Sequence, residues 1–132
     1  MKELDAVKRG GFRMQAEWRQ QKGILLSWPL NPETWKDRRA ALEAAYARFA
    51  ATISFFEDVF IFCRAPFQER ALELLERAGA RMSAIRLFDA PTDDAWCRDH
   101  GPICLKNDSN ESLLLDFQYN AWGGKFTPFD SD

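Results

Sequence analysis

One nine-residue stretch, residues 94–102 (DAWCRDHGP), gathers the side chains that could do chemistry, including the only histidine of the chain. If this stretch forms a turn, Trp96 and Asp99 are three positions apart and can converge on one side. A carboxylate beside an indole suits a planar cation, because the carboxylate accepts paired N–H bonds and the ring offers its negative face. The alternative is a polar connecting loop, in which Asp93 and Asp94 accept backbone N–H groups and Trp96 fills the core.

A nucleophilic pair of Cys97 with His100 is a second possibility for the same stretch. Asp94 and Asp99 flank the thiol and disfavour its ionisation, whereas reactive cysteines lie near cations or helix N-termini. Arg98 is an immediate neighbour along the chain and tends to point elsewhere. We therefore expect His100 to be a hydrogen-bonded structural residue and Cys97 not to be a nucleophile.

The three cysteines, Cys63, Cys97 and Cys104, form no C-x-x-C pair and no metal-ligand spacing with His100. We expect no disulfide framework, no metal site and reduced thiols, as in a cytoplasmic protein. Cys63 and Cys104 are expected to be core residues of apolar strands.

A glycine pair, Gly123 and Gly124, follows Asn120 and Trp122 in the segment NAWGGKF. The segment is not a G-x-G-x-x-G fingerprint, so a phosphate-binding loop is not supported. Two glycines beside a tryptophan predict a tight turn with positive φ. The surrounding tail is expected to be a structured loop that packs through its aromatic residues, Tyr119, Trp122, Phe126 and Phe129.

The elements that must position these residues alternate between strands and helices. Apolar runs at 23–29, 58–63 and 84–88 predict strands, and a helix is expected at 66–79, ended by Gly79. A second helix is expected from Thr34, with Asp37 completing a capping box. Its apolar stripe would comprise Leu42, Ala45, Tyr46, Phe49, Ile53 and Phe56, leaving Arg38, Arg39, Glu43 and Arg48 off the stripe. Short strands at 102–105 and 112–117 predict a hairpin. This order predicts an α/β layer structure.

Composition narrows the classes of partner. The chain has 132 residues, with 18 Lys and Arg against 20 Asp and Glu and a net charge of −2, so no nucleic-acid partner is expected. No apolar run approaches the roughly 18 residues that cross a bilayer, so no membrane partner is expected. The N-terminus lacks the apolar stretch of a signal peptide, which favours a cytoplasmic location.

Four motifs together resemble the agmatine deiminase and bacterial peptidylarginine deiminase family: GFRMQAEW, SWPLNPETW, PTDDAWCRDHGPI and LDFQYNAWGGKFTPFDSD. The resemblance implies an α/β propeller of five blades, of the pentein type. Residues 1–132 would then be a single N-terminal fragment, about one ββαβ-like blade plus part of the next. A departure is EWRQQKG, where relatives usually carry Pro-His after Glu-Trp.

The resemblance also implies a reaction and roles. A cysteine thiolate attacks the guanidinium carbon, ammonia leaves, and a histidine-activated water releases the ureido product, with no metal or organic cofactor. Asp99 would grip the guanidinium and Trp96 would line the pocket, with Asp94 as a further substrate-binding residue. The resemblance further implies pocket-lining or loop-structuring residues, namely Arg98, His100, Asn120, Trp122, Gly123 and Gly124.

The same resemblance places the catalytic histidine and cysteine in a C-terminal portion, outside these 132 residues. The chain by itself is therefore expected to be inactive, and its exposed apolar edge is expected to favour self-association. The substrate is expected to be agmatine, with peptidyl-arginine as the alternative. A non-catalytic guanidinium-binding module and an interaction fragment that docks on a complete propeller stay open as other functions.

Overall fold

The computed structural model describes residues 2–127, without the side chains of residues 2–4, 6, 32 and 33. Its elements in chain order are α1 (Lys2–Arg9), β1 (Arg13–Met14), β2 (Gly23–Ser27), α2 (Pro32–Trp35), the 3₁₀ turn η1 (Lys36–Arg38), α3 (Arg39–Ser54), β3 (Asp58–Phe62), α4 (Ala65–Arg77), the 3₁₀ turn η2 (Met82–Ala84), β4 (Ile85–Phe88), α5 (Cys97–His100), β5 (Ile103–Lys106), β6 (Ser112–Leu115) and α6 (Ala121–Gly124). Among the described residues, no helix is both long and apolar enough to span a membrane.

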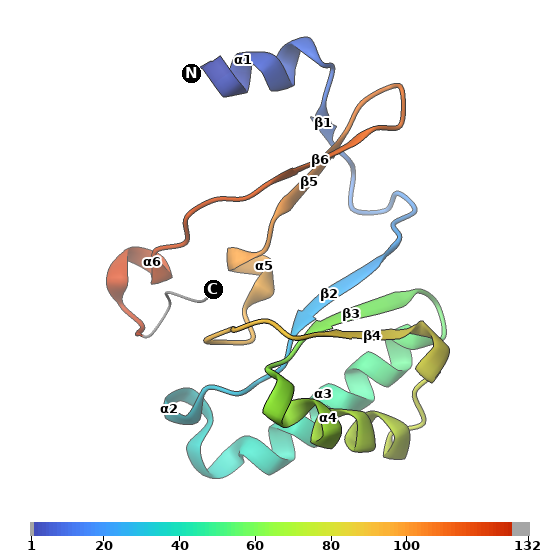
Figure 1. Cartoon of the computed structure of the whole chain (residues 1–132), viewed down its shortest axis with the longest axis vertical. Coiled ribbons are helices and arrows are strands. Elements are labelled where there is room, and N and C mark those ends of the chain that lie inside the picture. The colour runs from blue at the N-terminus through green and yellow to red at the C-terminus, as the bar shows by residue number, and fades with distance from the viewer. Residues whose placement is uncertain (1, 128–132) are drawn as a thin grey trace.

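A parallel sheet of order β2-β3-β4 forms one end of the molecule (Figure 1). Parallel neighbours need a crossover, and α3 and α4 supply the two crossovers on the same face of the sheet. The core lies between that face and the helices, where Val59 and Ile61 of β3 meet Ala50 of α3 and Leu75 of α4. The predicted β-α-β-α-β order is therefore confirmed.

The buried face of α3 differs from the predicted apolar stripe. Phe49 is 53% exposed and Phe56 is 82% exposed. The buried residues of the helix are instead mostly small, namely Glu43, Ala47, Ala50, Ala51 and Ser54. Alanine and serine let α3 approach the sheet and α4 closely, which phenylalanine rings at those positions would prevent.

The predicted capping box is also wrong. Asn31 Oδ1 accepts a hydrogen bond from the Thr34 N–H at 3.0 Å, so Asn31 caps α2, and Pro32 takes the first helical position, which needs no N–H. Through η1 the chain then continues into α3.

A buried carboxylate joins the crossover helices to the end of β2. Glu43 is 1% exposed, and its Oε1 accepts a hydrogen bond from Trp28 Nε1 at 3.3 Å. Its Oε2 accepts from Arg70 Nε at 2.9 Å, which ties α3 to α4. A second cation, Arg39, lies 3.6 Å from Oε1. Glu43 was not expected in the core, and its partners explain why a charge is tolerated there.

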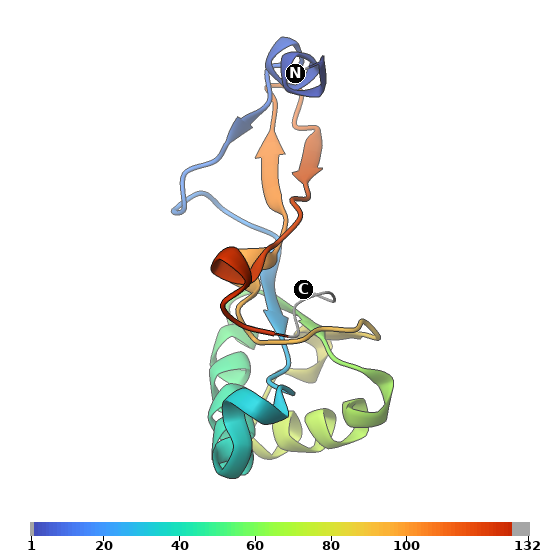
Figure 2. The ribbon, with the colours of Figure 1, turned by 90° about the vertical axis from the view of Figure 1, so that its left-hand side faces the viewer.

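The second sheet is antiparallel, with order β1-β5-β6, and stands at the opposite end of the molecule (Figure 2). The predicted hairpin is confirmed as β5 and β6, in which Cys104 pairs with Leu114. Its turn is closed by Asn107 Oδ1, which accepts the Glu111 N–H at 3.0 Å. Strand β1 was not predicted, because its two residues carry no periodic pattern.

The two strand cysteines differ in burial. Cys63, which follows β3, is fully buried as predicted. Burial, with help from Glu43 and Asp89, raises the pKa of the Cys63 thiol to about 11. Cys104 is exposed, so its predicted core position is wrong. It lies on a sheet face on which its paired residue Leu114 is also exposed.

Candidate functional site

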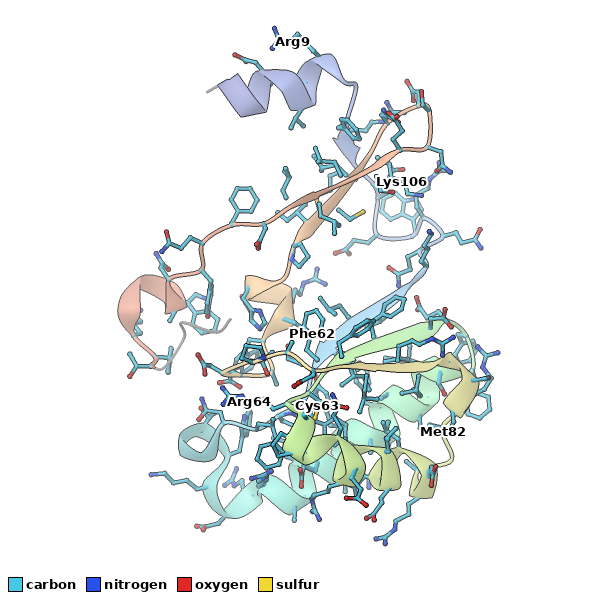
Figure 3. All side chains as sticks on the ribbon, in the orientation of Figure 1. Arg9, Phe62, Cys63, Arg64, Met82 and Lys106 are labelled. Atoms are coloured by element: carbon cyan, nitrogen blue, oxygen red, sulfur yellow. The ribbon has the colours of Figure 1, made fainter. Side chains whose placement is uncertain are left out.

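Residues 89–93, the loop before the stretch at residues 94–102, are hydrogen-bonded to residues at the carboxyl end of β3. Figure 3 labels Cys63 and Arg64 there, at the start of α4. Arg64 Nη2 donates to the Thr92 carbonyl at 3.3 Å and pairs with Asp93 Oδ1 at 3.4 Å. Asp89 Oδ1 accepts the Ala65 N–H at 2.8 Å. Residues 89–93 are thereby held against the parallel sheet.

Asp94 is engaged by α2 and by its own loop. Its Oδ1 accepts hydrogen bonds from Trp35 Nε1 at 3.3 Å and from the Ala95 N–H at 2.7 Å. Its Oδ2 accepts from Thr34 Oγ1 at 3.4 Å. These bonds agree with the connecting-loop interpretation, in which Asp94 supports the backbone. A substrate-binding role for Asp94 stays a prediction.

Helix α5 is the single turn on which the Trp96–Asp99 hypothesis depended. The Asp99 N–H donates to the Trp96 carbonyl at 2.8 Å, and the Gly101 N–H donates to the Cys97 carbonyl at 2.8 Å. Cys97 Sγ donates to the Leu25 carbonyl of β2 at 3.2 Å, which seats α5 on the parallel sheet. The turn that the hypothesis required is present, and the Cys97 thiol in it makes a structural hydrogen bond.

A cavity of about 220 Å³ lies between α5 and the segment after β6. Its wall is formed by Arg98, Asp99, His100, Gly101, Ile103, Phe117, Gln118, Tyr119 and Asn120. The ring of His100 lies 5.8 Å from that of Tyr119, centroid to centroid. The cavity therefore brings together four of the predicted site residues: Arg98, Asp99 and His100 come from α5, and Asn120 comes from the segment after β6. The wall residues Phe117 and Gln118 were not predicted as site residues, although both lie in the motif that begins LDFQYN.

An aromatic cluster, defined as Trp96, Tyr119, Trp122 and Phe126, adjoins this cavity through Tyr119. Trp122 meets Trp96 edge to face, with ring centroids 6.4 Å apart and planes at 81°. It meets Tyr119 and Phe126 in the same way, each at 5.5 Å. The prediction that the tail packs through its aromatic residues is confirmed for these three, while Phe129 lies outside the described residues.

Helix α6 is a left-handed turn. The φ angles are 50° at Ala121, 54° at Trp122, 84° at Gly123 and 75° at Gly124. The carbonyl of Asn120 accepts the N–H groups of Gly123 at 3.1 Å and Gly124 at 2.7 Å. Positive φ at the glycines was predicted, and its extension to Ala121 and Trp122 was not.

The left-handed backbone costs roughly 1–2 kcal/mol for each residue that has a Cβ. The three edge-to-face contacts of Trp122 each contribute about 0.5–1.5 kcal/mol, which offsets that cost. The ring contacts thus explain how a tryptophan is held in a conformation that favours glycine.

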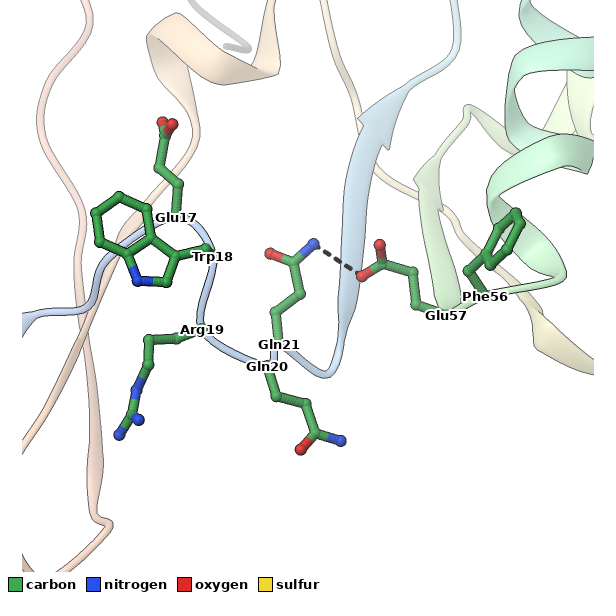
Figure 4. A pocket seen from close by; sticks show the side chains of 7 residues that line it. All are labelled: Glu17, Trp18, Arg19, Gln20, Gln21, Phe56 and Glu57. Carbon is green, nitrogen blue, oxygen red and sulfur yellow. Dashed lines mark hydrogen bonds between the residues drawn. The ribbon is translucent and has the colours of Figure 1, made fainter.

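A second hollow of about 300 Å³ lies between the segment before β2 and the end of α3 (Figure 4). Gln21 Nε2 donates to Glu57 Oε2 across it at 2.8 Å. An exposed ion pair of Glu17 with Arg98, at 2.6 Å, connects this segment to α5. Because both side chains are exposed, the pair contributes little to stability.

Tyr46 of α3 lies near Asp94 and Cys97. Burial raises the pKa of Tyr46, and the nearby Cys97 and Asp94 add to that effect. Among the described side chains, no group of three or more His, Cys, Asp or Glu residues could hold a metal ion.

Comparison with known proteins gives a consistent likeness. The family model for Porphyromonas-type peptidyl-arginine deiminase matches residues 13–132. An agmatine deiminase of Pseudomonas putida is 36% identical over 125 residues, which covers 94% of this chain and 33% of the relative. A solved agmatine deiminase of Enterococcus faecalis has a TM-score of 0.83 and 29% identity, covering 95% of this chain and 34% of that structure. The chain spans about a third of the length of the curated relatives it matches.

Proposed function

The chain belongs to the Porphyromonas-type peptidyl-arginine deiminase family, and on that basis we propose that it supplies one wall of the active site of a guanidine deiminase acting on agmatine. The matched relatives named above are agmatine deiminases. The observation that carries the proposal is Asp99 in the wall of a cavity, with the half-exposed Trp96 three residues away on the same helical turn.

In this proposal Asp99 binds the guanidinium group and Trp96 covers its face. The carboxylate accepts two N–H bonds in the plane of the cation, and the indole attracts the cation through its negative face. Holding the guanidinium carbon in one orientation lowers the barrier to attack by a nucleophile. Arg98, His100 and Asn120 line the same cavity, and Asp94 supports the loop or adds a second carboxylate.

The reaction is hydrolysis of a C–N bond. A cysteine thiolate adds to the guanidinium carbon and ammonia is expelled, which leaves an S-alkylthiouronium intermediate. Water then adds to the same carbon and the thiolate leaves, which gives N-carbamoylputrescine from agmatine. This sequence needs no metal or organic cofactor. In this proposal the nucleophilic cysteine and the histidine belong to a part of the enzyme outside these 132 residues. We therefore expect the 132-residue chain alone to release no ammonia.

The architecture proposed for the whole enzyme is the five-bladed propeller. Residues 1–132 would form a single fragment of it, with the parallel sheet and its two helices in one blade and the antiparallel sheet contributing to the next. The mixed α/β fold and the TM-score of 0.83 against an agmatine deiminase support this assignment.

The test is a titration of the ¹⁵N-labelled chain, followed by NMR. We expect agmatine to shift the Asp99 amide and the Trp96 indole signals. The diamine 1,4-diaminobutane lacks the guanidinium group and should leave both signals in place. Asp99→Asn, which keeps the shape of the side chain but not its charge, should weaken agmatine binding by at least about tenfold. Unmoved Asp99 and Trp96 signals would refute the proposal.

The alternative substrate is peptidyl-arginine, which the name of the family model supports. An arginine residue blocked at both ends presents the same guanidinium without a free amine. Tighter binding of this compound than of agmatine would assign the chain to a peptidyl-arginine deiminase.

A further inference from the structure

The backbone of the left-handed turn is unusual because two of its residues are not glycine. Ala121 and Trp122 have φ angles of 50° and 54°, a region that residues with a Cβ rarely adopt. Such a conformation persists only where neighbouring contacts hold it, and it concentrates at functional sites. The contacts of this turn therefore indicate what it is for.

The turn connects the Asp99 cavity to Trp96. At its start, Asn120 lies in the cavity wall and accepts the Gly123 N–H through both its carbonyl and its side-chain oxygen. At its centre, Trp122 meets the ring of Trp96. Trp122 and Trp96 both lie outside the cavity wall, and Trp122 also contacts the wall residue Tyr119, so Trp122 has two routes to a ligand: the ring of Tyr119 and the ring of Trp96.

We infer that the turn Ala121–Gly124 is a positioning element that presses Trp122 against Trp96 and so fixes the orientation of the Trp96 indole for a planar cation. The inference rests on the proposed function, because that function assigns Trp96 to the guanidinium. Trp96 is 48% exposed, and an indole so exposed has several rotamers open to it. If Trp96 sampled several rotamers, a ligand would have to select one of them. The ligand would then bind more weakly than to a Trp96 ring that is already oriented.

The orientation of Trp96 can be measured without a ligand. Three-bond couplings give the χ1 rotamer populations of Trp96 in the wild-type chain and in two variants, Trp122→Leu and Trp122→Phe. We expect one dominant rotamer in the wild type and in Trp122→Phe, which keeps a ring, and averaging over rotamers in Trp122→Leu. Phe55→Leu, which removes a 61% exposed ring outside the cluster, is the matched control and should change nothing.

The second measurement is the affinity for agmatine. We expect Trp122→Leu to weaken binding by about three- to tenfold, and Trp122→Phe to retain most of the affinity. Circular dichroism shows whether each variant is folded. If Trp122→Leu does not fold, Gly124→Ala replaces it, since this change disfavours the φ of 75° while keeping the Trp122 ring.

The outcomes separate the inference from the function on which it rests. An unchanged Trp96 rotamer and unchanged affinity in folded Trp122→Leu would overturn the inference while leaving the proposed function in place. A wild-type chain that does not bind agmatine would refute the proposed function and, with it, the role of this turn in binding a cation. Rotamer averaging together with weaker binding would support both.

Discussion

Replacing Glu43 by alanine tests whether the buried carboxylate stabilises the fold through the partners described above. The substitution removes the acceptor of Trp28 Nε1 and the ionic partner of Arg70. Trp28 is fully buried, so its indole N–H cannot turn to water. The side chain of Arg70 is 53% exposed, so its guanidinium can be rehydrated.

The expected loss follows from these two contacts. A buried donor left without an acceptor costs about 1–3 kcal/mol. The bond to Arg70 adds roughly 1 kcal/mol, since a half-exposed partner is screened by solvent. Glu43→Ala should therefore lower the free energy of unfolding by about 2–4 kcal/mol. Glu43→Gln keeps the volume and one carbonyl oxygen for Trp28, so it should cost less than half as much.

Urea denaturation followed by tryptophan fluorescence measures both variants. Arg70→Met is the control, because it removes the ionic partner and leaves the Trp28 contact intact; its cost should be about 1 kcal/mol. Equal losses for Glu43→Ala and Glu43→Gln would refute the reasoning, since they would assign the effect to the charge rather than to the acceptor.

Four further predictions have direct measurements. Iodoacetamide at pH 8 should label the exposed Cys104 quickly and Cys63 only after unfolding, as read by mass spectrometry. The folded-state pKa of Cys63 is raised to about 11. The stabilisation from its neutral thiol is therefore complete below the ordinary thiol pKa of about 8.5 and is lost as the pH rises towards 11. Urea titrations from pH 8 to 10.5 should show this decline in the free energy of unfolding, and a flat profile would contradict the prediction. Gly101→Ala places a Cβ 2.4 Å from the Cys97 carbonyl oxygen, so it should destabilise the chain by about 1–3 kcal/mol and perturb the NMR signals of α5. Self-association of the 132-residue chain should appear as a concentration-dependent shift in size-exclusion chromatography, and Phe56→Ser should reduce it; a monomer at every concentration would count against the exposed-edge prediction.

The parallel sheet and the positive φ of the glycine pair could be predicted from the sequence. Continuous apolar runs separated by amphipathic segments have few other solutions, so the β-α-β-α-β order could be predicted. The glycine pair predicted positive φ, whereas the helical turn of α5 was only the condition under which Trp96 and Asp99 could converge.

Other features depend on contacts between distant segments and leave little trace in a local pattern. Alanines make the close approach of α3 to the sheet. In the sequence, their methyl groups indicate a buried face more weakly than the rings of Phe49 and Phe56 do. The left-handed conformation of Trp122 is held by rings elsewhere in the chain, one of them on Trp96. The cavity wall takes Phe117 and Gln118 from the segment after β6, which ends at Leu115, whereas the sequence predicted a strand up to residue 117.

The antiparallel sheet has a consequence for the order in which the chain folds. Strands β2, β3 and β4 are consecutive, and the hairpin of β5 and β6 closes over a short turn. By contrast, β1 must find β5 across most of the chain, and the Arg13–Asp108 contact beside it joins residues 95 positions apart. Closing so long a loop is entropically costly until its ends are already near each other. The N-terminal strand should therefore dock last, and its amides should be the first of any sheet to exchange with solvent deuterium.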